Sequence, residues 1–133
     1  MFKKLFRKNE LPVTTYNADG IGTFTWNGED EYWEGTYNGV KVSISYDGYS
    51  KPTPKLVGEL RSTLLDNEFP SNLMNRVFQK AASEHLDIPE LKPKDIIFQK
   101  PGFVLIQFFS PEDHEPFWFA EIHSKKVYIG CDT

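Results

Sequence analysis

Two short segments in the first half of the chain, 32–37 and 40–46, alternate between apolar and polar residues and are separated by Asn38-Gly39. Asn-Gly is typical of a type I′ turn, because both central residues of that turn need a positive φ angle. A two-residue turn fixes the register of the hairpin, with the apolar residues on one face. Gly35, in the middle of this face, leaves room for a bulky neighbour. The predicted pairs on the apolar face are Trp33 with Ile44, Gly35 with Val42, and Tyr37 with Val40.

Helical periodicity follows in the middle of the chain. Thr53-Pro54 provides an N-cap and a first-turn proline, and leucines recur at helical spacing over 56–64. Phe69-Pro70 ends this segment, and Ser71 is a candidate cap for a second amphipathic helix. The apolar stripe predicted for the second helix consists of Leu73, Met74, Val77, Phe78 and Ala81. We expect both helices to pack on the apolar face of the sheet.

The remaining strand-like segments complete an α+β pattern. They cover residues 23–26, 96–99, 103–109, 117–123 and 126–130. Residues 103–109 are apolar on both faces except at Gln107, which predicts a central strand that is covered on both sides. The order is three strands, two helices and four strands, which predicts a mainly antiparallel sheet with two helices packed on one face. The predicted division is a basic tail and linker over 1–19 and a single domain over 20–133.

Charge is distributed unevenly along the 133 residues. The first eight include Lys3, Lys4, Arg7 and Lys8 and no acid, whereas the rest carries 11 basic and 19 acidic side chains. A body with this excess of acid repels phosphate backbones, so we expect no nucleic-acid partner. The same charge suits a basic protein partner.

The N-terminal segment resembles a signal peptide only in its charge, since no apolar stretch of sufficient length follows it. No run of 18 apolar residues occurs, and the basic segment is too short for more than weak contact with a lipid surface. We therefore expect no stable membrane association. The single cysteine, Cys131, excludes an internal disulfide and fits a reducing compartment, which predicts a cytoplasmic protein.

Ionisable residues are densest at Asp113-His114-Glu115, with Glu121 and His123 on the strand that follows. Three successive loop residues rarely converge on one ion, and two residues on a strand face make a poor metal site. No nucleotide-binding or hydrolase motif has its required context, and Cys131 lacks the surroundings of a nucleophile. We predict no catalytic residues, no metal and no cofactor. A hydrolase or metal enzyme built on Asp113, His114 and His123 is the weakest alternative.

Several motifs together resemble a group of small bacterial domains. They are Gly22-Thr23-Phe24-Thr25-Trp26, then Trp33-x-Gly35-x-x-x-Gly39-x-x-Val42-x-Ile44, and a closing Val127-x-Ile129-Gly130. This looks like uncharacterised bacterial domains with a G-x-F opening, a W-x-G hairpin and a glycine-ended last strand, over about residues 20 to 132. Some relatives of that kind are suspected immunity proteins of polymorphic toxin systems. The resemblance implies a protein that neutralises a toxin domain by binding it.

Aromatic residues make up 15% of the chain, more than two short helices need for their core. In 117–119 consecutive aromatic side chains point to opposite faces, so some rings either fill a second core or form a binding patch. We predict a non-enzymatic protein-binding domain, immunity-like, in which acids beside aromatic residues contact a basic toxin. The alternative is a small-molecule-binding domain that uses an aromatic-rich sheet face. The candidate contact residues are Glu29, Asp30, Glu31, Glu112, Asp113, Glu115 and Trp118.

Overall fold

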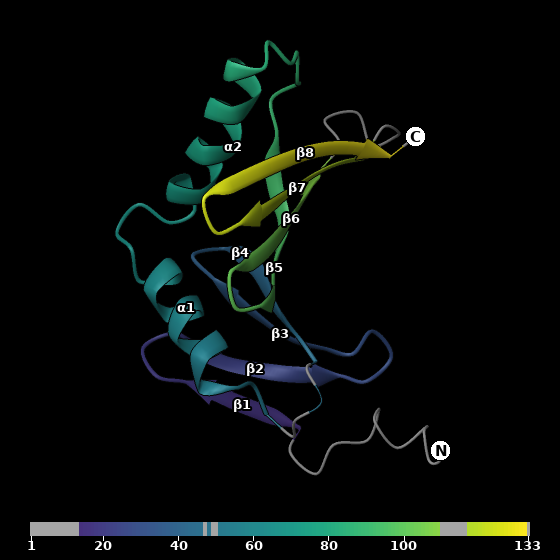
Figure 1. Ribbon diagram of the computed structural model, residues 1–133. Helices are drawn as coiled ribbons and strands as arrows, with labels where there is room; N and C mark the ends of the chain where they lie inside the picture. Colours follow the sequence, from purple (N-terminus) through teal and green to yellow (C-terminus); the bar gives the residue numbers. More distant parts are fainter. Residues whose placement is uncertain (1–13, 47, 49–50, 110–116, 133) are drawn as a thin grey trace.

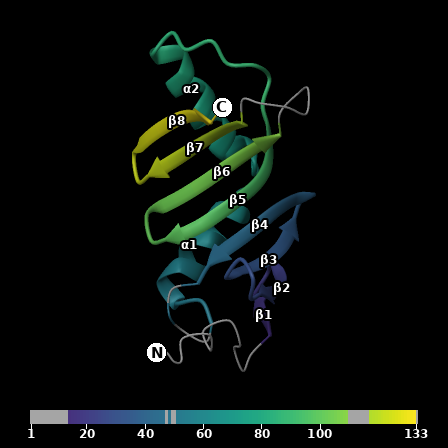
Figure 2. The same cartoon turned by 90° about the vertical axis from the view of Figure 1, so that its right-hand side faces the viewer.

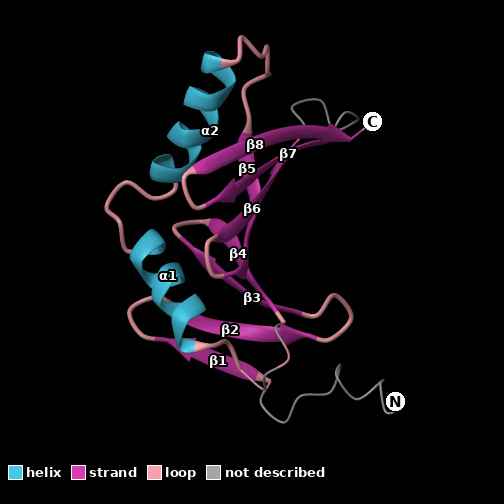
Figure 3. Ribbon diagram, in the orientation of Figure 1, coloured by secondary structure: helices cyan, strands magenta, loops and turns pink. Residues whose placement is uncertain are grey.

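The computed structural model describes residues 14–46, 48, 51–109 and 117–132 (Figure 1). These form one eight-stranded sheet in which strand order follows chain order. The strands are β1 (Thr15–Ala18), β2 (Gly22–Asn27), β3 (Tyr32–Tyr37), β4 (Val40–Ser45), β5 (Lys92–Lys100), β6 (Phe103–Phe109), β7 (Phe117–His123) and β8 (Lys126–Asp132). Two helices, α1 (Pro54–Leu64) and α2 (Ser71–Ser83), lie between β4 and β5 in the chain (Figure 3).

Every neighbouring pair of strands is antiparallel except β4 and β5, which are parallel. A parallel pair needs a long crossover connection, and the two helices supply it. Both helices therefore lie on the same side of the sheet, which we call the helix face (Figure 1). The opposite side, the open face, has no helix of the described residues across it (Figure 2). The predicted α+β class and mainly antiparallel sheet are confirmed.

The hairpin of β3 and β4 has the predicted register, with Trp33 opposite Ile44 and Gly35 opposite Val42. Asn38 and Gly39 have φ angles of 52° and 76°, as a type I′ turn requires. Gly35 also has the predicted role, because a Cβ there would lie 2.9 Å from Cδ2 of Phe24. The buried Phe24 ring from β2 thus occupies the space that Gly35 leaves.

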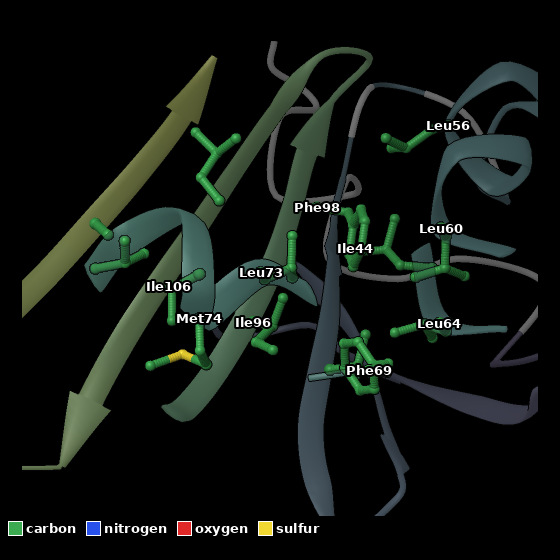
Figure 4. Packing of buried hydrophobic residues seen from close by; sticks show 14 of the residues in the cluster. Ile44, Leu56, Leu60, Leu64, Phe69, Leu73, Met74, Ile96, Phe98 and Ile106 are labelled. Atoms are coloured by element: carbon green, nitrogen blue, oxygen red, sulfur yellow. The ribbon is translucent and has the colours of Figure 1, made fainter. Parts of the chain in front are cut away.

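The core lies between the helix face and the two helices (Figure 4). In α1 the stripe Leu56, Leu60 and Leu64 is buried, and Figure 4 shows it directed toward Ile44 and Phe98 on the sheet. In α2 the buried residues are Leu73, Met74, Val77 and Ala81. Burial of this apolar area from both helices is what attaches them to one side of the sheet.

Two predicted details of α2 are wrong. Phe78 is 38% exposed, because it lies at the border of the stripe rather than at its centre. Ser71 is the first helical residue and not the cap, since Pro70 occupies the N-cap position. Pro70 makes no side-chain hydrogen bond to the start of the helix, where Asn72 Oδ1 instead accepts from the backbone N–H of Leu73 at 2.9 Å.

The region expected to be a linker contains strand β1, which pairs with β2 from Thr15 opposite Thr25 to Ala18 opposite Gly22. The sequence pattern does not indicate this strand, because four residues are too few to show a clear alternation. Its helix-face residues contribute to the core: Ala18 is buried, and Tyr16 packs against the core. The structure therefore has four strands before the helices, where three were predicted.

Strand β6 also differs from its prediction. On the helix face Ile106 and Phe108 are buried, but Phe109 on the other face is 55% exposed. The strand is thus covered on one side only, since both helices pack on the same face of the sheet.

Candidate functional site

The open face of β6, β7 and β8 carries a group of large apolar side chains that we call the aromatic face. It consists of Phe103, Leu105, Phe109, Phe117, Phe119 and Tyr128. Strand pairing places these residues on one side, since side chains alternate along each strand and β6 is in register with β7 and β7 with β8.

Exposure distinguishes the aromatic face from the rest of the surface. Phe109 is 55% exposed, and Phe117 and Tyr128 are each 51% exposed. The other exposed large apolar side chains of the described residues are Leu65, Phe78 and Leu86, which belong to the helices or their adjoining turns. A cluster of exposed aromatic rings on one surface is typical of a binding site, whereas scattered apolar residues are ordinary.

This face is hollowed beside Phe117 and Phe119. A hollow of about 370 Å³ is lined on the open face by Leu105, Phe117, Phe119 and Glu121, among other residues. Phe119 lies against Gly130 of the neighbouring strand, where a Cβ atom would overlap its ring. Gly130 therefore allows the Phe119 ring to lie flat across β8 instead of standing away from the sheet.

His123 lies at one end of the aromatic face. Its ring centroid is 4.1 Å from that of Phe103 and 5.4 Å from that of Tyr128, and its Nε2 lies 3.1 Å from Oε1 of Glu121. Glu121 and His123 share a strand face, as predicted. There His123 packs against the rings of Phe103 and Tyr128 and contacts Glu121. Among the described residues no group of three or more His, Cys, Asp or Glu side chains could hold a metal ion. Asp113 and His114, the other members of the weakest alternative, lie outside the described residues.

A polar network occupies the open face on the neighbouring strands. The hydroxyl of Ser43, on β4, donates to the carboxylate of Asp95 on β5, with Oγ 3.1 Å from Oδ1. Nζ of Lys41 lies 3.7 Å from Oδ2 of Asp95 and 3.4 Å from Oε2 of Glu34. Asn27 Nδ2 donates to the same Glu34 oxygen at 3.2 Å. This network fixes four adjacent strands to one another beside the aromatic face.

Burial dominates the ionisation of Asp95, which is 7% exposed. It raises the pKa of the Asp95 carboxyl, and the Ser43 hydrogen bond and the Lys41 charge offset it only in part. For Lys41, burial lowers the pKa, but the charges of Asp95 and Glu34 outweigh it and raise the pKa above its ordinary value. The carboxylate of Asp95 is thus held at a cost in stability.

We expect Asp95→Asn to be more stable than the wild type at pH 7. The raised pKa means that the folded state binds the Asp95 proton more tightly than the unfolded state, so stability falls as pH rises through the window above the unfolded pKa of about 3.9. Asparagine cannot ionise and can still accept from Ser43. Urea unfolding between pH 3 and 7 should show that the free energy of unfolding of the variant exceeds that of the wild type at pH 7, and that this difference shrinks as pH falls.

Ser43→Ala is the matched control for this prediction. It removes the hydrogen bond to the carboxylate, so it should lower stability at pH 7, opposite to the change at Asp95. A loss of stability for Asp95→Asn that is the same at pH 3 and pH 7 would contradict the assigned effect of burial.

The acidic turn between β2 and β3 is well ordered by Asn27. Its Oδ1 accepts from the backbone N–H groups of Glu29, at 3.1 Å, and Asp30, at 3.2 Å. Glu29 and Asp30 are exposed and Glu31 is half-buried. This turn projects to the open side of the sheet, to the right in Figure 1.

The other predicted contact residues have different positions. Trp118 is half-buried on the helix face, where it packs against the core, while its neighbours Phe117 and Phe119 point to the open face. Glu112, Asp113 and Glu115 lie outside the described residues. The sequence reasoning missed Phe109 and Tyr128 as candidate contacts. Two features of the sequence could have indicated them. The chain has a surplus of aromatic residues, and its two helices can cover only one face of the sheet.

No helix of the described residues is long and apolar enough to cross a membrane. No protein-family model matches the chain, and no match was found among curated proteins or solved structures. The arrangement of the aromatic face, the hollow and the acidic turn is therefore the basis for a functional assignment.

Proposed function

We propose that this chain is a non-enzymatic protein-binding domain and that the aromatic face is its contact surface. The observation that carries the proposal is the half-exposure of Phe109, Phe117 and Tyr128 on one helix-free side of the sheet. Rigid aromatic side chains supply most of the energy in protein interfaces, because they bury a large area at a small loss of conformational entropy. Strands hold these rings in place before any partner binds, which limits the ordering needed on association.

Charge favours a basic protein as the partner. Beyond the first eight residues, 19 acidic side chains exceed 11 basic ones, and the exposed Glu29 and Asp30 lie on the open side of the sheet. Acidic groups at the rim of an interface raise the rate of association with a basic surface more than they raise the affinity. A basic toxin domain would complement this acidic charge, and toxin domains are the class suggested by the sequence resemblance. Binding to such a domain would make this protein immunity-like and intracellular.

Site-specific cross-linking in the native host tests this proposal. A photoreactive phenylalanine analogue replaces Phe109 or Phe117 on the aromatic face, or the exposed Phe78 on α2 as the matched control. We expect the same protein adduct from positions 109 and 117 and none from position 78, because only the first two belong to the contact surface.

A charge variant in the same experiment tests the class of partner. Glu29→Lys combined with Asp30→Lys should slow formation of the adduct and reduce its dependence on salt, since both carboxylates are exposed. Equal adducts from positions 78 and 117, or no adduct from the aromatic face, would reject the contact surface. An unchanged salt dependence would reject a basic partner.

The hollow supports a second candidate function, the binding of a small molecule. Its volume of about 370 Å³ is within the range of roughly 300–1,000 Å³ that is usual for ligand pockets, and its lining combines aromatic residues with the polar side chains of Lys94, Gln107, Glu121 and Asp132. Binding there would involve Phe117 of the aromatic face, so the cross-linking result distinguishes the two functions. A small-molecule site predicts no protein adduct from position 109 or 117.

A further inference from the structure

Strand β8 ends the sheet and has β7 as its strand neighbour among the described residues (Figure 2). In an antiparallel pair, alternate residues direct their backbone N–H and C=O groups to the neighbouring strand, and the residues between them direct these groups away. A two-residue turn joins β7 to β8 and pairs His123 with Lys126. This alternation directs the backbone groups of three residues to the edge of the sheet: Val127, Ile129 and Cys131.

This edge lacks three of the features that prevent strand pairing. Proteins protect edges with prolines, bulges or very short strands. β8 has seven residues and no proline, and it pairs with β7 in a regular register at all seven positions. The opposite edge, β1, has only four residues. β8 is thus the longer and more regular of the two edges.

We infer that β8 pairs with β8 of a second copy of this chain, antiparallel, about a two-fold axis at Ile129. The full seven-residue overlap brings Ile129 opposite Ile129 of the second copy. It also brings Lys126 opposite Asp132 of the second copy, and symmetry repeats this contact. Opposite charges directly across an antiparallel pair stabilise it, and this register pairs both charged ends of the strand.

Side chains on the open face fit the same register. Lys126, Tyr128, Gly130 and Asp132 share that face, so Tyr128 lies opposite Gly130 of the second copy, next to the Phe119 ring that covers that glycine. The aromatic face thereby continues from one copy to the other.

A basic groove beside β8 provides further charge complementarity. α2 and the start of β8 line a groove of about 600 Å³ that contains Arg76, Lys80, Lys125 and Lys126, and no acidic residue lines it. Arg76 attaches α2 to the β7–β8 turn, since its Nη2 donates to the backbone oxygen of Ser124 at 2.6 Å. In the inferred dimer, the acidic end of the second β8 lies next to this groove.

The test is a charge exchange measured by sedimentation equilibrium of the full chain over a range of concentrations. Lys126 and Asp132 are both exposed, so their substitution leaves the core intact, and circular dichroism checks this. The wild type should form a dimer. Lys126→Asp or Asp132→Lys alone places like charges opposite each other twice and should raise the dissociation constant roughly tenfold. The double variant Lys126→Asp with Asp132→Lys should restore the dissociation constant of the wild type.

A wild type that remains monomeric at all concentrations would overturn the inference. Single variants that dimerise as well as the wild type would also overturn it. So would a double variant whose dimer dissociation constant is no lower than those of the single variants. The inference does not depend on the proposed function, because Phe109 and Phe117 lie on other strands and their substitution leaves the β8 edge unchanged.

Discussion

Trp33→Ala should lower the free energy of unfolding by about 3–5 kcal/mol, the range for removing a large aromatic side chain from a core. Trp33 is 1% exposed and is the largest fully buried side chain of the described residues. Its ring centroid lies 6.3 Å from that of Tyr16 and 5.3 Å from that of Trp26, so it connects β1, β2 and β3. Alanine would leave a cavity and remove these ring contacts. Urea unfolding followed by circular dichroism measures the loss.

Trp33→Phe is the control, because it retains a ring at the same position and should cost less than half as much. A domain with a total stability of roughly 5–15 kcal/mol would retain only a small margin after the alanine substitution. A loss below about 1 kcal/mol for Trp33→Ala would show that Trp33 is not a central core residue.

Gly35→Val should destabilise the domain by about 3 kcal/mol, at the upper end of the usual range for overpacking. A Cβ at this position would lie 2.9 Å from Cδ2 and 3.0 Å from Cε2 of Phe24. The Phe24 ring is 1% exposed, so neighbouring core residues prevent it from moving away. The added methyl groups force either the ring or the β2–β3 pairing to shift. Thermal and urea unfolding both measure the effect.

Gly58→Ala is the matched control for this substitution. Gly58 lies within α1, and a Cβ there would meet no atom within 4 Å. Alanine should therefore stabilise the domain by about 0.5–1 kcal/mol, through the restricted unfolded chain and the better helix propensity. Destabilisation by both substitutions to the same extent would contradict the close approach of Phe24 to Gly35.

Local patterns in the sequence predicted the local structure well. Asn38-Gly39 determines the turn and register of its hairpin, and leucine spacing identifies α1, because these signals depend on residues close together in the chain. The parallel pairing of β4 with β5 could not be predicted in this way. It joins Ser43 to Asp95, 52 positions apart, and no alternation within either segment indicates its neighbour.

The candidate site was harder to predict for a related reason. An alternating strand shows which residues share a face, but it does not show whether another layer covers that face. Residues 103–109 are apolar on both sides, so the sequence favoured a strand buried on both faces, whereas Phe109 is exposed. Similarly, the sequence predicts Trp118 as a contact residue, but the alternation places Phe117 and Phe119 on the open face instead.

The affinity of the cross-linked partner for paired variants tests the central claim most directly. The first variant, Phe109→Ser with Phe117→Ser, removes two rings of the aromatic face, and Leu65→Ser with Phe78→Ser removes two exposed apolar side chains elsewhere. Isothermal titration calorimetry should show a loss of affinity of roughly 30-fold or more for the first variant, as for truncated interface hot spots. It should show no change for the second. Equal affinities for both variants and the wild type would contradict binding through the aromatic face.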